Sequence, residues 1–210
     1  MKRIVYLKWL VGLALMCSIL TAMVLVLIPR KEFYSYLYTR QNMEQSVGMT
    51  IFEAGLNYDG LVQQIMGNAE IRGLSTYESS QDLDAKLERL HSMYVCCEWI
   101  CGLGLLLIVA GLMILRNQRW YECLKLGGLL TVGIQILLAG VVAGLPALHH
   151  FVINSQYQEF LAYDEKLVEI LPTNWALCMA GSWAVGCLLI AGIVLLIYLI
   201  NHRKYRPHRF

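Results

Sequence analysis

The stretch LGGLLTVGIQILLAGVVAGLPALHH, from Leu126 to His150, decides how this chain is organised. No charged side chain occurs between Lys125 and the adjacent histidines His149 and His150. A helix needs roughly 20 apolar residues to cross the hydrocarbon core of a bilayer, and this run is long enough. The sequence therefore predicts a membrane-spanning helix that ends beside two imidazoles.

Three further runs of the chain have the same character. The uncharged runs are Trp9–Pro29, Trp99–Leu115 and Ile170–Asn201. Of the 210 residues, 58% are hydrophobic, against about 45–50% in an average soluble domain. We therefore expect an all-α polytopic membrane protein with four spans, near residues 6–28, 95–115, 123–145 and 175–200. The first run is longer than the core of a signal peptide, so we expect it to be a retained anchor.

Charge divides unevenly between the segments that flank these spans. The N-terminal end, the region of the short loop 116–122 and the basic tail 201–210 carry ten of the 17 Lys and Arg residues and one acid. Residues 29–94 and 146–174 carry the other seven basic residues and 13 acids, and the remaining acid, Glu98, lies just beyond the first of these segments. The positive-inside rule places both termini in the cytoplasm and these two segments outside a bacterial plasma membrane. No basic surface for a nucleic acid is expected.

The long segment 29–94 should form a small extracellular cap of mixed secondary structure, because a plain loop of that length is uncommon. Asn57-Tyr58-Asp59 predicts the start of a cap helix, and Gly67-Asn68 predicts its end. Residues 45–52 predict a short strand.

A second cap helix should begin near Ser80. Large side chains recur at intervals of four, three and four residues, which is typical of one helix face; they are Leu83, Leu87, Leu90 and Tyr94. No proline or glycine interrupts the pattern before Gly102. We therefore expect this helix to run without a break into the second span.

The five histidines fall into two groups. His202 and His208 lie in the basic tail, where they need no special role. His91, His149 and His150 lie near the predicted start of the second span and the end of the third, on the same side of the membrane. These spans are consecutive, so their ends should be neighbours and the imidazoles should converge. A neutral imidazole accepts a proton on one nitrogen and donates on the other, which suits acid–base catalysis; the alternative is a set of interfacial anchors.

Other residues near the histidines can support or line such a site. Aromatic side chains are more numerous than four helix ends require, and some should line a substrate pocket: Tyr34, Tyr36, Trp99, Phe151 and Trp175. Glu98 either orients a histidine or lies at the interface. The seven cysteines include no C-x-x-C pair, so no metal site is predicted.

Two short stretches contain the histidines of interest: Leu90–Val95, LHSMYV, and Leu148–Asn154, LHHFVIN, which Pro172 follows before the fourth span. Together with Phe33–Tyr36 and the four-span architecture, they resemble the bacterial lipoprotein intramolecular transacylase (Lit) family. The first stretch is similar to the family's His-Met-x-Asp-Val-Lys stretch. The second is similar to its Phe-His segment and the Asn that follows, and Pro172 to its proline ahead of the fourth span.

Two departures from the family pattern lie beside the first histidine. Tyr94 stands where Asp is expected, and Cys96 stands where Lys is expected. Counting back from Pro172 favours His149 over His150 as the second family histidine.

The resemblance implies an acyl transfer within one lipoprotein molecule. The acyl chain at the glyceryl sn-2 oxygen would move to the amine of the N-terminal cysteine, giving the lyso-form. His91 and His149 would be the catalytic residues, with His91 as the base or with the roles exchanged, and His150, Tyr94 and Asn154 would support them. No cofactor is needed; the partners are lipid-modified lipoproteins and membrane lipid. Activity should fall below about pH 6, where imidazoles become protonated.

Two other classes of function fit the same sequence. A haem- or metal-binding membrane protein would use His91 with His149 or His150 as ligands, and would show a Soret band or bound metal. A non-enzymatic four-helix subunit would copurify with a partner and tolerate histidine substitutions.

Overall fold

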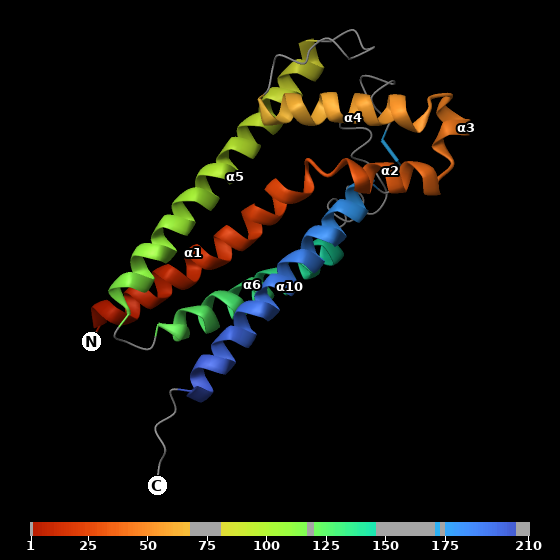
Figure 1. The fold of residues 1–210 in the computed structure, drawn as a ribbon. Helices are drawn as coiled ribbons and strands as arrows, with labels where there is room; N and C mark the ends of the chain where they lie inside the picture. Colours follow the sequence, from red (N-terminus) through yellow and green to blue (C-terminus); the bar gives the residue numbers. More distant parts are fainter. Residues whose placement is uncertain (1, 68–80, 117–119, 146–170, 173–174, 205–210) are drawn as a thin grey trace. The chain divides into compact units, whose positions relative to one another are not determined.

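The computed structural model describes residues 2–67, 81–116, 120–145, 171–172 and 175–204, and every regular element within them is an α-helix. The helices are α1 (Lys2–Leu27), α2 (Lys31–Arg40), α3 (Met43–Val47), α4 (Ile51–Met66), α5 (Gln81–Ile114), α6 (Tyr121–Gly144) and α10 (Trp175–Lys204) (Figure 1). We refer to α2, α3 and α4 together as the cap.

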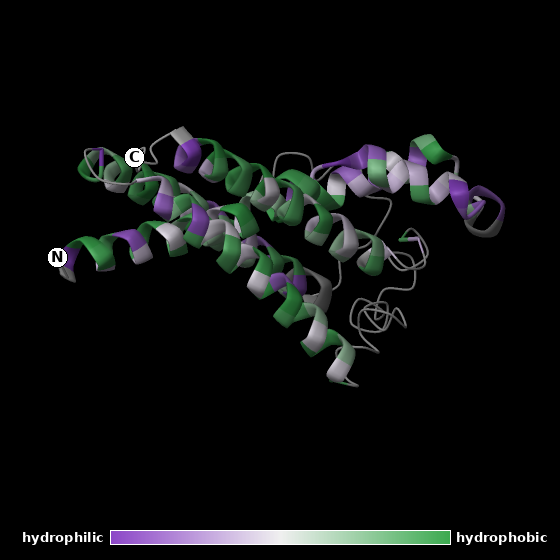
Figure 2. Ribbon diagram, turned by 90° about the horizontal axis from the view of Figure 1, so that it is seen from below, coloured by the Kyte–Doolittle hydropathy of each residue, from purple (hydrophilic) through white to green (hydrophobic). Residues whose placement is uncertain are grey.

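Four of these helices, α1, α5, α6 and α10, are long and apolar enough to cross a membrane. Hydrophobic residues cover most of their length (Figure 2). Many large apolar side chains on them are exposed, for example Leu106, Ile114 and Leu189 at 68%, 70% and 65%. Water would penalise such surfaces, whereas lipid tails solvate them. The predicted all-α polytopic fold with four spans is confirmed.

The described residues divide into two compact units. The first, which we call the span unit, contains residues 1–24, 97–140 and 183–210. Small residues let its helices approach closely, as is common in membranes: a Cβ on Gly111 would collide with Val11, and one on Gly104 with Ser18. Across the same unit, the indole nitrogen of Trp183 donates to the carbonyl of Leu20 at 2.9 Å.

The second unit, the cap unit, contains residues 25–96 and 141–182. Its core is aromatic: the rings of Tyr34 and Tyr58 stack with centroids 4.3 Å apart. The Tyr58 hydroxyl donates to the carbonyl of Ile28 at 3.1 Å, and the Tyr38 hydroxyl donates to that of Met49 at 3.0 Å. Burial, with the nearby Asp59 carboxylate, raises the pKa of Tyr58 to about 12. The phenol therefore stays protonated and fastens α4 to the end of α1.

The predicted strand over 45–52 is wrong, and the described part of the cap is helical. Helix α3 ends at Val47, Gly48 follows with a left-handed φ of 73°, and α4 begins at Ile51. The helix start predicted at Asn57 is therefore six residues too late. Thr50 caps α4: its side chain accepts from the Glu53 N–H while the Glu53 carboxylate accepts from the Thr50 N–H. This reciprocal pair satisfies two N–H groups that a helix start leaves unpaired.

Two other predictions about this region are confirmed. Helix α4 ends at Met66, and Gly67 follows in the left-handed conformation with φ of 83°. Helix α5 is continuous over 34 residues, from Gln81 in the cap unit to Ile114 in the span unit. At 1.5 Å per residue it is about 50 Å long, enough to project beyond a bilayer core.

Candidate active site

His91 lies on α5, and its imidazole is held by the C-terminal end of α4. The Nδ1 atom is 2.9 Å from the carbonyl oxygen of Ile65, which is in the last turn of α4. Carbonyls in the last turn lack a partner within their own helix. The Gly67 N–H satisfies those of Gln63 and Gln64, and the imidazole contacts that of Ile65.

This contact determines which nitrogen of His91 carries the proton. A carbonyl oxygen only accepts hydrogen bonds, so Nδ1 must donate. In the neutral ring the Nε2 atom then has a free lone pair. The end of α4 thus holds a half-buried imidazole through Nδ1, and the nitrogen that carries the lone pair is Nε2.

Gly67 is required at this point for two separate reasons. Its φ of 83° belongs to the left-handed region, which disfavours residues with a Cβ. A Cβ placed on it would lie 2.6 Å from Cε1 of His91, well inside van der Waals contact. The end of α4 is therefore shaped to receive the imidazole ring.

An apolar contact between α4 and α5 supports the same arrangement. Leu87 is buried, and Leu61, Ile65 and Leu90 pack against it. Because Leu90 directly precedes His91 in the chain, this cluster sets the height and rotation of α5 relative to the last turn of α4. The hydrophobic contact brings the histidine and the carbonyl together.

The supporting residues predicted on α5 lie in different environments. Tyr94 is buried, whereas Glu98 and Trp99 are exposed, Trp99 by 67%. Glu98 lies seven residues beyond His91, about 10 Å along the helix axis. Glu98 and Trp99 therefore lie on the surface of the part of the chain that the structure describes.

The predicted pocket aromatics separate into core and surface residues. Tyr34 is fully buried, and Trp175 packs against the same cluster, with its ring 6.5 Å from that of Tyr58. Tyr36 is 58% exposed, and its hydroxyl accepts from Arg40 Nη1 at 3.4 Å. The structure therefore brings Tyr34 and Trp175 together in the core of the cap unit, and leaves Tyr36 on the surface.

Four predicted residues, His149, His150, Phe151 and Asn154, lie outside the described residues. The convergence of the histidines therefore stays a prediction. Within the described stretches, no three His, Cys, Asp or Glu side chains group as a metal site would require, but a site that uses the histidine pair is not tested by this.

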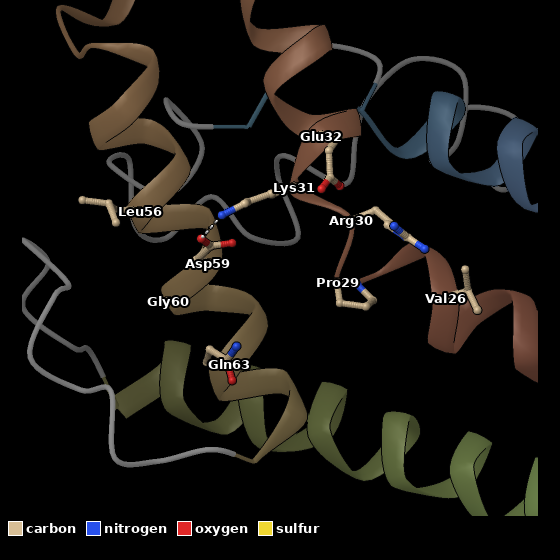
Figure 3. A pocket seen from close by; sticks show the side chains of 9 residues that line it. All are labelled: Val26, Pro29, Arg30, Lys31, Glu32, Leu56, Asp59, Gly60 and Gln63. Carbon is tan, nitrogen blue, oxygen red and sulfur yellow. Dashed lines mark hydrogen bonds and ion pairs between the residues drawn. The ribbon is translucent and has the colours of Figure 1, made fainter.

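A pocket in the cap unit was not predicted from the sequence. It has a volume of about 630 Å³ and lies between the α1–α2 junction and α4 (Figure 3). Its lining residues are Val26, Pro29, Arg30, Lys31 and Glu32 from the junction, and Leu56, Asp59, Gly60 and Gln63 from α4. Lys31 Nζ is 3.4 Å from Asp59 Oδ2 across it. The two walls are about 30 residues apart in the chain, and no local sequence signal joins them.

Four apolar spans, with a helical cap that orients an imidazole on the second of them, define a polytopic membrane protein with a candidate acid–base residue. A family model of the lipoprotein intramolecular transacylase Lit matches residues 9–175. The chain belongs to this family, and it is accordingly a membrane acyltransferase.

Solved structures of Lit from Bacillus cereus share this fold. One covers 98% of this chain and 99% of its own, with a TM-score of 0.79 and 17% identity. Variants in which a histidine is replaced by arginine or by alanine give TM-scores of 0.79 and 0.80, also at 17% identity. At that identity the likeness shows the fold alone. A search of curated proteins found no match.

Proposed function

We propose that this protein moves the sn-2 acyl chain of a diacylglyceryl lipoprotein onto the amine of the lipoprotein's own N-terminal cysteine. The family supplies the reaction class, an intramolecular transfer on a lipoprotein. The observation that carries the proposal is the 2.9 Å contact between His91 Nδ1 and the Ile65 carbonyl. It gives the neutral imidazole a free Nε2, which is what a general base needs.

The proposed reaction balances without a cofactor. The cysteine nitrogen attacks the ester carbonyl, a C–N bond forms, and His91 Nε2 accepts the proton that the amine loses. The bond from the carbonyl carbon to the sn-2 oxygen then breaks, and His149 protonates that oxygen. The products are an amide on the cysteine and a free glyceryl hydroxyl. Because both groups belong to one molecule, holding them together can remove roughly 7–11 kcal/mol of the barrier.

We also propose that the cap faces outward, with His91 at the depth of the lipid head groups. The support is the charge asymmetry of the flanking segments and the position of His91 in the cap-unit part of α5, eight residues before the uncharged run that begins at Trp99. Tyr36 and Trp99, which are exposed, are available to contact acyl chains. Phe151 and Asn154, close to His149 in the chain, remain candidates for substrate contacts.

Mass spectrometry of lipoproteins from cells with and without the protein tests the reaction. Cells that express it should contain the lyso-form, with fragmentation placing one acyl chain on the cysteine amine. Lipoproteins that are unchanged by its expression, or that carry the acyl chain elsewhere, would exclude the proposed transfer.

Substitution of the histidines tests the mechanism. His91→Asn keeps a polar side chain but removes proton exchange near pH 7, so the rate should fall by about 10²–10⁴-fold. His149→Ala should abolish transfer, whereas His150→Ala should reduce it only in part, because adjacent residues point in different directions. His202→Asn is a matched control, since His202 packs on Tyr121 and Tyr198 far along the chain. A His91→Asn protein with the wild-type rate would eliminate the two-histidine mechanism.

A further inference from the structure

The pocket between the α1–α2 junction and α4 lies close to the His91 contact along α4. Leu56, Gly60 and Gln63 line it from α4, and their spacing of four and three residues places them on one face. Gln63 is in the last turn of α4, as is Ile65, whose carbonyl contacts His91, and Gly67, four residues after Gln63, lies against the His91 ring. The near end of the pocket is therefore about one helical turn from the imidazole.

The distance from the pocket to His91 along α4 matches a short peptide. From Gly60 to Gly67 is seven residues, or about 10 Å along a helix. An extended peptide advances about 3.3–3.6 Å per residue, so about three residues cover the distance. A chain whose first residue lies at His91 would place its next few residues in the pocket.

The charges of the pocket favour a neutral ligand. Arg30 and Lys31 are balanced by Glu32 and Asp59, and Lys31 is already paired with Asp59 at 3.4 Å. An anionic phosphate would meet two carboxylates as well as two cations. Peptide groups carry both donors and acceptors, and a wall with charges of both signs can bind each kind.

Gly60 leaves room for a backbone to approach. No atom lies within 4 Å of the position that a Cβ on Gly60 would occupy. A glycine in the middle of a helix costs about 1 kcal/mol relative to alanine, and close approach of a ligand backbone is one reason to keep it. Gly60 is among the residues that line the pocket (Figure 3).

We propose that this pocket binds the peptide stem of the substrate, the few residues that follow the lipid-modified cysteine of a lipoprotein. The proposal rests on the proposed function, which places that cysteine at His91. Binding through backbone groups would let the enzyme accept lipoproteins of different sequence.

The test compares two ligands and two variants of the purified full-length protein. One ligand is a diacylglyceryl-cysteine followed by four uncharged residues and a fluorophore; the other is diacylglyceryl-cysteine amide with the fluorophore attached directly. Gly60→Leu fills the pocket. Gly55→Leu is the matched control, because Gly55 is also inside α4 with no atom within 4 Å of its Cβ position, but does not line the pocket.

Fluorescence anisotropy should show that the wild-type protein binds the lipopeptide at least tenfold more tightly than the short ligand. Gly60→Leu should remove this difference and leave affinity for the short ligand unchanged, while Gly55→Leu should preserve both affinities. Equal wild-type affinity for the two ligands would overturn the proposal. If Gly60→Leu loses affinity for both ligands equally, the proposal is also overturned, because the pocket would then bind the lipid itself.

Turnover of the same ligands separates this proposal from the proposed function. If the wild-type protein converts neither ligand to an amide product, the proposed transfer is wrong. The anisotropy result still decides whether the pocket binds the peptide. A last measurement adds phosphatidylglycerol to the lipopeptide binding assay. If it weakens binding to the wild-type protein but not to Gly60→Leu, the pocket binds a phospholipid head group instead, and the proposal is overturned.

Discussion

At the scale of single residues, the imidazole of His91 depends on a glycine as much as on a hydrogen bond. Gly67 gives the end of α4 its left-handed turn and leaves the space that the ring occupies. The same turn exposes the Ile65 carbonyl that Nδ1 contacts. A residue with no chemical function of its own therefore controls the orientation of the proposed base.

Gly67→Ala should impair activity more than its backbone cost alone explains. Alanine in the left-handed region costs about 1–2 kcal/mol, and its Cβ would also push the His91 ring out of place. A misplacement near 1 Å can cost about 10²-fold in rate. Gly48→Ala is the matched control, because Gly48 also has a positive φ, of 73°, but no atom within 4 Å of its Cβ position.

The pair is compared by thermal unfolding and by the rate of acyl transfer. Both variants should lose similar stability, and only Gly67→Ala should lose most of its activity. If both variants lose stability and activity in the same proportion, the contact with His91 has no role in catalysis.

At the scale of elements, α4 is the organising helix of the cap because its two sides and its two halves have different partners. Ala54, Tyr58 and Val62 are buried in the aromatic core. Leu61 and Ile65, further along the same side, pack against α5. The opposite side lines the pocket. Any change in where α4 begins or how it rotates would therefore alter the core, the pocket and the imidazole together.

Thr50→Ala should destabilise the cap by about 1 kcal/mol, because it removes the side-chain cap of α4. Thr39→Ala is the control: Thr39 is exposed, and its hydroxyl donates to the Ser35 carbonyl inside α2, where alanine is tolerated or preferred. Chemical unfolding of the two variants in detergent measures the difference. Equal stability of the two variants would show that the capping box is not formed.

The hydrogen bonds between Thr50 and Glu53 that cap the start of α4 should also weaken in acid. Hydrogen bonds from the Thr50 backbone and side chain lower the pKa of Glu53. A carboxyl group whose folded pKa lies below its unfolded value stabilises the fold above the unfolded value, about 4.3, and loses that contribution as pH falls through the folded value. The gap between Thr50→Ala and wild-type stability should therefore narrow below about pH 4.

At the scale of the whole molecule, apolar surface determines that the chain lies in a membrane, and charge determines its orientation there. The four apolar helices require a bilayer because their exposed side chains are largely hydrocarbon. The basic residues near their ends determine which way the chain inserts. In the span unit, Lys8 donates to Glu122 at 2.6 Å, between the N-terminal parts of α1 and α6. This pair balances the single acid found among the residues predicted to be cytoplasmic.

Reporter fusions should establish the orientation. Green fluorescent protein fused after Phe210 or within the loop 116–122 should fluoresce, as it does in cytoplasm, and alkaline phosphatase inserted after Ser79 should be active, as it is outside. The opposite pattern would place His91 and the cap on the cytoplasmic side and remove the proposed access to mature lipoprotein head groups.

The sequence by itself determined the spans, the end of α4 and the continuity of α5. Inside a bilayer every backbone group must be bonded within its own helix, so a long uncharged run has few alternatives to a helix. Gly67 ends α4 because of its own conformational freedom, and α5 continues because no breaker interrupts it. The start of α4 was also readable, from the Thr50-Ile-Phe-Glu53 capping box, but a short apolar run does not distinguish strand from helix, and the strand prediction was wrong.

Only the tertiary structure decided which residues meet. Tyr34, expected from the sequence to line a pocket, is fully buried and stacks on Tyr58. The imidazole of His91 and the carbonyl of Ile65 are 26 residues apart in the chain, and the walls of the pocket are about as far apart. Such contacts depend on how whole helix faces pack, and that is set by the sum of many weak apolar contacts rather than by any local signal in the sequence.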